Sequence, residues 1–196
     1  MQSPEAIRLR LAEIQQTVGP NVTVVAATKY VPLAQMATLV DAGVRVVGEN
    51  RAQDLEAKHA EFGDAFEWHF IGHLQSNKVN VVNRICALVH SLDSESAARR
   101  LEIPALVQVN LAEEGSKSGV GVSEIADYLG FGVVGLATMP PVADDPEASR
   151  PWFARLAELA SEHGLKELSM GTTQDFRVAA EEGATYVRVG SALFAD

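Results

Sequence analysis

Apolar residues recur along this chain with two spacings, and each spacing predicts a different kind of element. Spacings of three and four positions are typical of a helix with one buried face. They first occur within residues 3–18, where Ile7, Leu11, Ile14 and Val18 share a face. Ser3 stands where a capping hydroxyl is expected. The same spacing predicts helices at 32–42, 151–163 and 174–182, and Ser76 and Ser94 are expected to cap two shorter helices.

Eight short runs that are apolar throughout predict strands. They cover residues 22–27, 44–48, 67–71, 87–92, 105–110, 132–137, 167–170 and 185–189. Strands without alternating polar positions are buried on both faces, as parallel strands between helices are. Eight such units favour a closed (β/α)8 TIM barrel over an open doubly wound sheet. We therefore expect one α/β domain over residues 1–196, although such barrels typically have about 250 residues.

Composition narrows the range of partners. The chain has 16 Lys and Arg against 26 Asp and Glu, and its formal net charge of −10 repels phosphate backbones and anionic lipid. We therefore expect neither nucleic acid nor a membrane as a partner. No apolar run approaches the roughly 20 residues of a membrane span, and the first residues lack the layout of a signal peptide. The one cysteine, Cys86, lies in an apolar run, which predicts a buried thiol in a cytoplasmic protein.

The ends of the last two predicted strands carry the pattern of a phosphate site. Active groups of a β/α barrel lie at the C-terminal strand ends, and phosphate is often held after strands seven and eight. Strand seven runs into Gly171, Thr172 and Thr173, and strand eight runs into Gly190 and Ser191. These residues supply close backbone approach and hydroxyl and N–H donors for an anion. We also expect Thr173 to cap the following helix; ordinary turn and cap roles are the alternative for both segments.

Two cations fall at the same predicted barrel mouth. Lys29 follows the first strand, where a desolvated lysine loses its proton easily enough to attack an aldehyde. A solvated surface lysine is the alternative. Arg188 lies within strand eight, where it either pairs with a buried carboxylate or donates to the ring nitrogen of a cofactor. A lysine for an aldehyde and a phosphate clamp across the same mouth are what pyridoxal phosphate requires.

Other polar residues near the strand ends are assigned structural roles. His69 and His73 are four residues apart on a strand and its loop, where that spacing does not share a face, so no zinc site is expected. Glu49 and Asp93 are expected to serve as a cap or in an ion pair.

Motifs along nearly the whole chain resemble those of the YggS/PROSC-type family of pyridoxal-phosphate homeostasis proteins. In order, they are Ala27-Thr28-Lys29, Gly48-Glu49-Asn50, Trp-His-Phe-Ile-Gly at 68–72, Leu-Gln-Ser-Asn-Lys at 74–78, His-Ser-Leu-Asp-Ser at 90–94, Gln-Val-Asn at 108–110, Ser-Lys-Ser-Gly at 116–119, Arg150-Pro151 with Phe153, and Val-Arg-Val-Gly at 187–190. The resemblance implies the barrel fold of the alanine racemase N-terminal domain and pyridoxal 5′-phosphate as cofactor.

Carried over by residue, the resemblance implies a Schiff base on Lys29, with Asn50 packed against the pyridine ring and Arg188 facing the ring nitrogen. Gly190 and Ser191 would hold the phosphate together with the loop after strand seven, which contains Met170, Thr172 and Thr173. Lys78 and Lys117 are the next candidates for the Schiff base.

The chain departs from the family pattern in two ways. Thr172 and Thr173 replace the second Met and the Ser of the usual Ser-Met-Gly-Met-Ser sequence, so the Thr173 methyl group could shift the phosphate loop. The chain is also shorter than usual around residues 99–104 and 129–132, which predicts truncated outer helices.

Three functions are compatible with these features. The resemblance favours a cofactor-binding protein of pyridoxal phosphate homeostasis, without turnover of its own, that hands the cofactor to apo forms of pyridoxal phosphate enzymes. A pyridoxal-phosphate racemase of amino acids is the second. The third is a phosphate-binding barrel enzyme in which Lys29 attacks a carbonyl sugar. We expect a monomer that binds a small-molecule cofactor.

Overall fold

All eight runs predicted as strands are strands in the computed structural model, which describes residues 2–112 and 118–194. They are β1 (Thr23–Ala27), β2 (Val46–Glu49), β3 (Glu67–Phe70), β4 (Leu88–Leu92), β5 (Ala105–Gln108), β6 (Val133–Ala137), β7 (Glu167–Ser169) and β8 (Tyr186–Val189). Neighbouring strands pair in parallel in chain order, and β8 pairs back with β1. The predicted (β/α)8 barrel is therefore confirmed.

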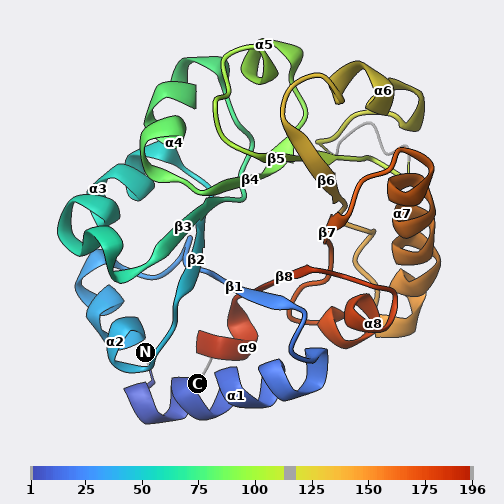
Figure 1. Ribbon diagram of the computed structural model, residues 1–196. Helices are drawn as coiled ribbons and strands as arrows, with labels where there is room; N and C mark the ends of the chain where they lie inside the picture. The colour runs from blue at the N-terminus through green and yellow to red at the C-terminus, as the bar shows by residue number, and fades with distance from the viewer. Residues whose placement is uncertain (1, 113–117, 195–196) are drawn as a thin grey trace.

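The helices form a ring outside the strands (Figure 1). They are α1 (Pro4–Val18), α2 (Met36–Asp41), α3 (Ala52–Phe62), α4 (Val79–Ile85), α5 (Glu95–Ala98), α6 (Ile125–Tyr128), α7 (Arg150–Glu162), α8 (Phe176–Glu181) and α9 (Ser191–Phe194). Only four residues each form α5 and α6, which confirms the predicted truncation of the outer helices.

The predicted helix caps are confirmed only in part. The Ser3 hydroxyl accepts a hydrogen bond from the Ala6 N–H and caps α1. Ser94 occupies the N-cap position of α5, but its hydroxyl bonds to the Ser96 hydroxyl within the helix rather than to a backbone N–H. The prediction for Ser76 is wrong, because a 3-10 turn, Ser76–Lys78, begins at this residue and precedes α4.

The two faces of the strands are packed differently. Outward-facing residues join the helices in one large apolar core, whereas Leu88, Leu106 and Ala137 form a separate small cluster. Successive side chains on a strand alternate between faces, so His90 on β4 points to the same side as Leu88. His90 is completely buried. The interior of this barrel therefore contains polar side chains that need hydrogen-bond partners.

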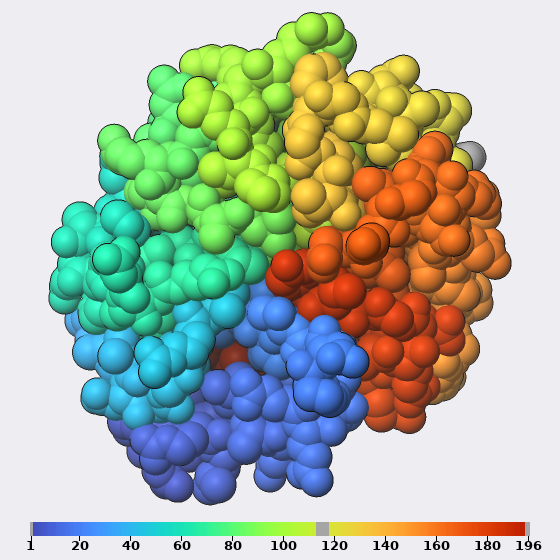
Figure 2. Space-filling view, viewed as in Figure 1, coloured from blue at the N-terminus to red at the C-terminus, as the bar shows by residue number. Residues whose placement is uncertain are grey.

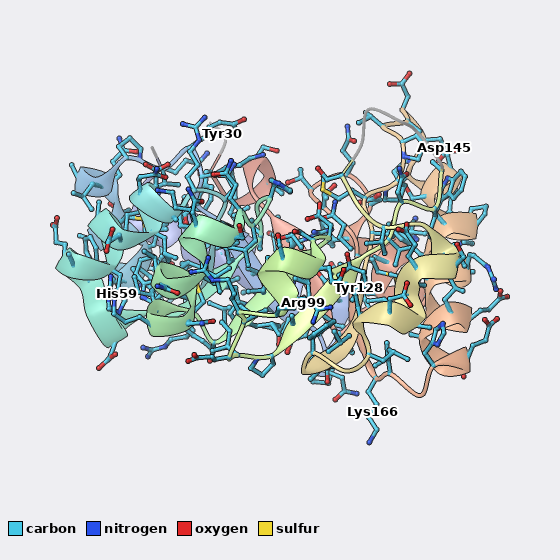
Figure 3. All side chains as sticks on the ribbon, turned by 90° about the horizontal axis from the view of Figure 1, so that it is seen from above. Tyr30, His59, Arg99, Tyr128, Asp145 and Lys166 are labelled. Carbon is cyan, nitrogen blue, oxygen red and sulfur yellow. The ribbon has the colours of Figure 1, made fainter. Side chains whose placement is uncertain are left out.

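The strands give the molecule two distinct ends. Tyr30, shortly after β1, and Asp145, in the loop after β6, lie at one edge of the molecule, and Lys166, directly before β7, lies at the opposite edge (Figure 3). In the space-filling view the first and last segments of the chain, blue and red, meet near the middle of the face shown (Figure 2). The ends of the chain thus complete the barrel at the β1–β8 seam.

Candidate functional site

A cavity of about 560 Å³ opens beside the seam where β1 meets β8. Its lining includes six of the eight predicted cofactor-binding residues, namely Lys29, Thr172, Thr173, Arg188, Gly190 and Ser191. They come from the loops after β1 and β7 and from β8 and its end, which lie side by side in the closed barrel. Barrel closure therefore assembles the two ends of the sequence into one cavity.

Two backbone donors converge on one oxygen in this cavity. The N–H groups of Gly190 and Ala192 both donate to the Thr173 hydroxyl oxygen, at 3.3 and 3.2 Å. Paired backbone N–H groups aimed at one point suit an oxyanion. The prediction that Thr173 caps the next helix is wrong, because Asp175 occupies the N-cap position of α8.

Asp175 also fixes the loop after β7. Its carboxylate accepts hydrogen bonds from the Thr172 N–H at 2.7 Å and from the Ser149 hydroxyl at 2.7 Å. Gly171 has φ +89°, and a Cβ there would stand 2.5 Å from the Cβ of Ala179, so only glycine fits. The loop is thereby held in one conformation next to the convergent N–H groups.

The Lys29 amine has no carboxylate partner in the part of the chain that the structure describes. It is exposed and lies 4.9 Å from the centroid of the Tyr30 ring. Its backbone is fixed nearby, because the Thr28 carbonyl accepts from the Val31 N–H at 2.8 Å. A lysine without an ion pair retains its amine for other chemistry.

A second lysine lies buried below Lys29. Lys58 on α3 donates to the Glu49 carboxylate at 2.5 Å and to the Thr28 carbonyl at 2.8 Å, and the Thr28 hydroxyl donates to the same carboxylate oxygen. This confirms the ion pair expected for Glu49. Lys58 thus neutralises Glu49 and keeps that carboxylate from pairing with Lys29. Sequence analysis missed Lys58, although Leu55 three residues earlier marks the same buried face of α3.

Arg188 points into the barrel with part of its guanidinium unused. It is 6% exposed, and its Nη2 donates to the Thr138 carbonyl at 2.8 Å. Its Nε is buried without a partner. Burial lowers the pKa of Arg188 to about 10, a shift that Asp175 opposes, so the side chain stays charged at neutral pH. Among residues 2–112 and 118–194, no carboxylate pairs directly with Arg188. The alternative role predicted for it, an ion pair with a buried carboxylate, is therefore removed.

Two predicted site residues do not line the seam cavity. Asn50 is half-buried and lines a neighbouring cavity with Gly72, whose Cα lies against the Asn50 backbone. Met170 is fully buried in the outer apolar core. The remaining alternative Schiff-base candidates also differ: Lys78 lines the neighbouring cavity, whereas Lys117 and its neighbour Ser116 lie outside the described residues.

A hydrogen-bonded line crosses the barrel interior. Glu67 on β3 accepts from His69 Nε2 at 2.9 Å, His69 Nδ1 accepts from His90 Nε2 at 2.8 Å, and His90 Nδ1 accepts from the Ser169 hydroxyl at 2.7 Å. Because the Glu67 carboxylate accepts, the His69 proton is assigned to Nε2, and this assignment fixes donor and acceptor at each later step of the line. Burial lowers the pKa of His69 and takes that of His90 well below its ordinary value, with His69 and Arg188 adding to the effect on His90. Both rings are therefore neutral.

The surroundings of Asp93 and Cys86 can be compared with the roles predicted for these residues. Asp93 accepts a hydrogen bond from His73 Nδ1 at 3.2 Å, and this contact is an ion pair only when the ring is protonated. No group of three or more metal-ligating side chains occurs within the described residues, His69 and His73 included. Cys86 is buried, and burial, with a smaller effect of Glu49, raises the pKa of its thiol to about 12. It is thus a structural thiol and not a nucleophile.

Comparison with known proteins identifies the class to which this barrel and its site belong. Residues 3–196 match the model of the alanine racemase N-terminal domain, and the chain belongs to this family. Among its relatives is the pyridoxal phosphate homeostasis protein of Aquifex aeolicus, 38% identical over 193 residues that cover 87% of this chain and 85% of the relative.

Solved structures of similar proteins have the same barrel fold. PipY of Synechococcus elongatus with bound PLP superposes with a TM-score of 0.84 at 32% identity, over 96% of this chain and 100% of PipY. Its structure without PLP gives 0.85 at 33% identity, with the same coverage. In the part of this chain that the structure describes, no helix has both the length and the apolar character needed to cross a membrane.

Proposed function

We propose that this protein binds pyridoxal 5′-phosphate in the seam cavity through a Schiff base on Lys29, and that it serves cofactor homeostasis without turning over a substrate. One observation carries the proposal. A lysine amine without an ion pair, two convergent N–H groups and a buried arginine with a free donor all line or adjoin a single 560 Å³ cavity. The relatives named for pyridoxal phosphate homeostasis support it.

The residues present fit the three chemical parts of this cofactor. The Lys29 amine matches an aldehyde, because the two condense without further activation once the amine is neutral. The hydroxyls of Thr173 and Ser191 match a phosphate, and so do the N–H groups of Gly190 and Ala192, which donate to the Thr173 oxygen here and would transfer to a phosphate oxygen. The unpaired Arg188 Nε–H matches the lone pair of a ring nitrogen.

Each residue then has a defined task. When bound, pyridoxal phosphate supplies an aldehyde that exchanges between amines. Lys29 holds that group, and the Thr173 loop orients the phosphate end. Arg188 has only N–H donors, so it offers the ring nitrogen a hydrogen bond and cannot stabilise its protonated form. This weakens the electron withdrawal on which transamination and racemisation depend.

The racemase remains the second candidate function, because the matching family model is that of a racemase domain. Racemisation needs a base on each face of the reacting carbon, and Lys29 can serve one face. Of the three tyrosines, Tyr30 adjoins Lys29 at the cavity, Tyr128 lies in α6, and Tyr186 lies within β8 against His69 and His90. Exchange of α-deuterium and chirality of several amino acids, followed with the loaded protein, separates the two functions. Turnover of order 1–1,000 per second would put the racemase first.

The recipients and the organisation of the chain stay predictions. Apo forms of pyridoxal phosphate enzymes are the proposed recipients of the cofactor, and we propose a monomer whose 196 residues form one cofactor-binding domain in the cytoplasm.

The decisive experiment is a spectrum of the purified protein with and without pyridoxal phosphate. We expect a visible band that borohydride abolishes as it fixes the mass of the cofactor on Lys29. The Lys29→Ala variant should lose the band and stay folded, because the side chain is exposed. Lys166→Ala, which removes a charge at the opposite end of the barrel, is the matched control and should keep it. An undiminished band in Lys29→Ala would transfer the Schiff base to another lysine.

A further inference from the structure

A second cavity lies at the same end of the barrel as the seam cavity, after β2 and β3, and its charge is opposite to that of the molecule. It has a volume of about 360 Å³ and is lined by Asn50, Arg51, Gln53, His73 and Lys78, among others. The lining holds Arg51 and Lys78 and no carboxylate, although acidic residues outnumber basic ones 26 to 16 in the chain. A cavity with this lining attracts small anions.

Neither cation is neutralised by another residue that the structure describes. Within the described residues, neither Arg51 nor Lys78 makes a side-chain hydrogen bond or ion pair, whereas most other arginines on the surface are paired. His73 is held by Asp93, which does not line the cavity. Glu49, the acidic residue nearest to Arg51 in sequence, is buried and paired with Lys58, and Asp54 lines a different cavity, beside Lys29 and Lys58. The positive charge in this cavity therefore stays available to a ligand.

Backbone donors add to that charge. Helix α3 has eleven residues and begins at Ala52, and no side chain caps its N-terminus. The first N–H groups of a helix have no partner within it and carry partial positive charge. Ala52 and Gln53, the first two residues of α3, both line the cavity. An oxyanion there would meet two cationic side chains and these N–H groups together.

The strand register places this cavity beside Lys29. Ala27 on β1 is paired with Gly48 on β2, so Lys29 and Asn50 each stand two residues beyond the same pair, in the loops that follow these adjacent strands. Adjacent strands are about 4.8 Å apart. A small molecule whose anionic end lay against Arg51 and Lys78 would therefore extend toward the amine of Lys29.

We propose that this cavity binds the α-carboxylate of a free amino acid whose amine takes the pyridoxal group from Lys29, an inference that rests on the proposed function. In that exchange the incoming amine forms the new C=N bond as the bond to the Lys29 nitrogen breaks, and the two amine protons end on the Lys29 amine. Amino acids are thus preferred over amines that lack a carboxylate. The seam cavity holds the cofactor, and the second cavity selects its acceptor.

The first test needs no cofactor. Protein free of pyridoxal phosphate is titrated with N-acetylglycine, which has a carboxylate and no reactive amine, and with neutral N-acetylglycinamide, while backbone amides are followed by NMR. We expect N-acetylglycine alone to shift the amides of Ala52 and Gln53. The double variant Arg51→Ala/Lys78→Ala should abolish the shifts, and Arg51→Ala alone should weaken them. The control variant Arg45→Ala/Lys166→Ala makes the same charge change at the other end of the barrel and should preserve the shifts. Shifts confined to Gly190 and Ala192, or equal shifts with both ligands, would overturn the inference.

The second test uses the loaded protein. The rate at which the Lys29 band decays is measured with glycine and with glycinamide, and the ratio of the two rates is compared between variants, so that the intrinsic reactivity of each amine cancels. Losing charge-assisted hydrogen bonds should lower the ratio about tenfold or more in Arg51→Ala/Lys78→Ala, and not in the Arg45→Ala/Lys166→Ala control. An unchanged ratio would overturn the inference. A wild-type protein that forms no Lys29 band would instead defeat the proposed function, and the titration would still decide whether the cavity binds a carboxylate.

Discussion

At the scale of single residues, Lys58 and Glu49 show how the protein isolates the reactive amine. Both are buried, and they pair at 2.5 Å beneath Lys29. Removing one member of a buried ion pair typically costs about 3–5 kcal/mol, because the other charge is left without compensation. We expect Lys58→Ala to lower the free energy of unfolding by about that amount in urea denaturation. Lys58→Met/Glu49→Gln, which removes both charges, should recover much of it. A stable Lys58→Ala variant would mean that Glu49 carries no charge in the fold.

Thr173 is the residue at which the phosphate grip can be measured. Its hydroxyl oxygen already accepts the N–H groups of Gly190 and Ala192. Thr173→Val keeps the shape and removes the hydroxyl, so we expect affinity for pyridoxal phosphate to fall about tenfold or more, which corresponds to about 1.5–3 kcal/mol for a hydrogen bond to a charged group. Pyridoxal without its phosphate is the control ligand and should bind weakly and equally to both proteins. Equal losses for the two ligands would remove Thr173 from the phosphate site.

At the scale of elements, the histidine line ties β3 and β4 to β7 across the barrel. The folded-state pKa values of His69 and His90 are depressed by burial, so below the ordinary value of 6.5 the unfolded chain binds protons that the folded chain does not. Stability is therefore fully present above about pH 6.5 and is lost as the pH falls below it, by up to about 1.4 kcal/mol per pH unit for each ring.

Urea denaturation at pH 7.5 and 5.5 tests this dependence. We expect the free energy of unfolding to fall by about 2–3 kcal/mol between the two values if both rings contribute. A His69→Gln/His90→Gln variant should show a smaller difference, whatever its absolute stability, and His163→Gln on the outside should show the wild-type difference. A constant stability across this interval would contradict neutral rings in the fold.

The sequence predicts strands better than it predicts what joins them. Apolar runs mark all eight strands because each is covered on its outer face by a helix, a local requirement visible in composition. Ser76 and Thr173 were assigned as caps from their neighbours alone, and both assignments fail because a 3-10 turn and Asp175 take those roles. The general placement of active groups in β/α barrels predicts that Lys29, Arg188 and Gly190 lie at the site. The role of His90 could not be predicted in this way: His69 lies on the adjacent strand β3, but Ser169 on β7 becomes a neighbour of His90 only when the barrel closes.

At the scale of the whole molecule, the proposed cofactor would join elements from both ends of the chain. Lys29 follows β1, and Thr173, Arg188 and Ser191 come from the region of β7 and β8. A ligand that binds only the closed barrel stabilises it by mass action, by about 2.7 kcal/mol at one hundred times its dissociation constant. We expect the urea midpoint to rise with pyridoxal phosphate concentration and to rise less with pyridoxal. A midpoint that does not change with cofactor concentration would show that the folded barrel does not bind the cofactor in preference to the unfolded chain.

The β1–β8 seam also determines when this protein can become competent during its synthesis. β1 leaves the ribosome among the first elements and finds one of its two neighbouring strands only after β8 has been made. Contacts so distant in sequence form late, and a nascent chain that lacks them exposes unpaired strand edges to other proteins. Lys29 is translated before β7 and β8, and the residues opposite it, Thr173 and Ser191, are absent until those strands have been made. A chain translated through β8 is therefore the form that the proposed cofactor can bind.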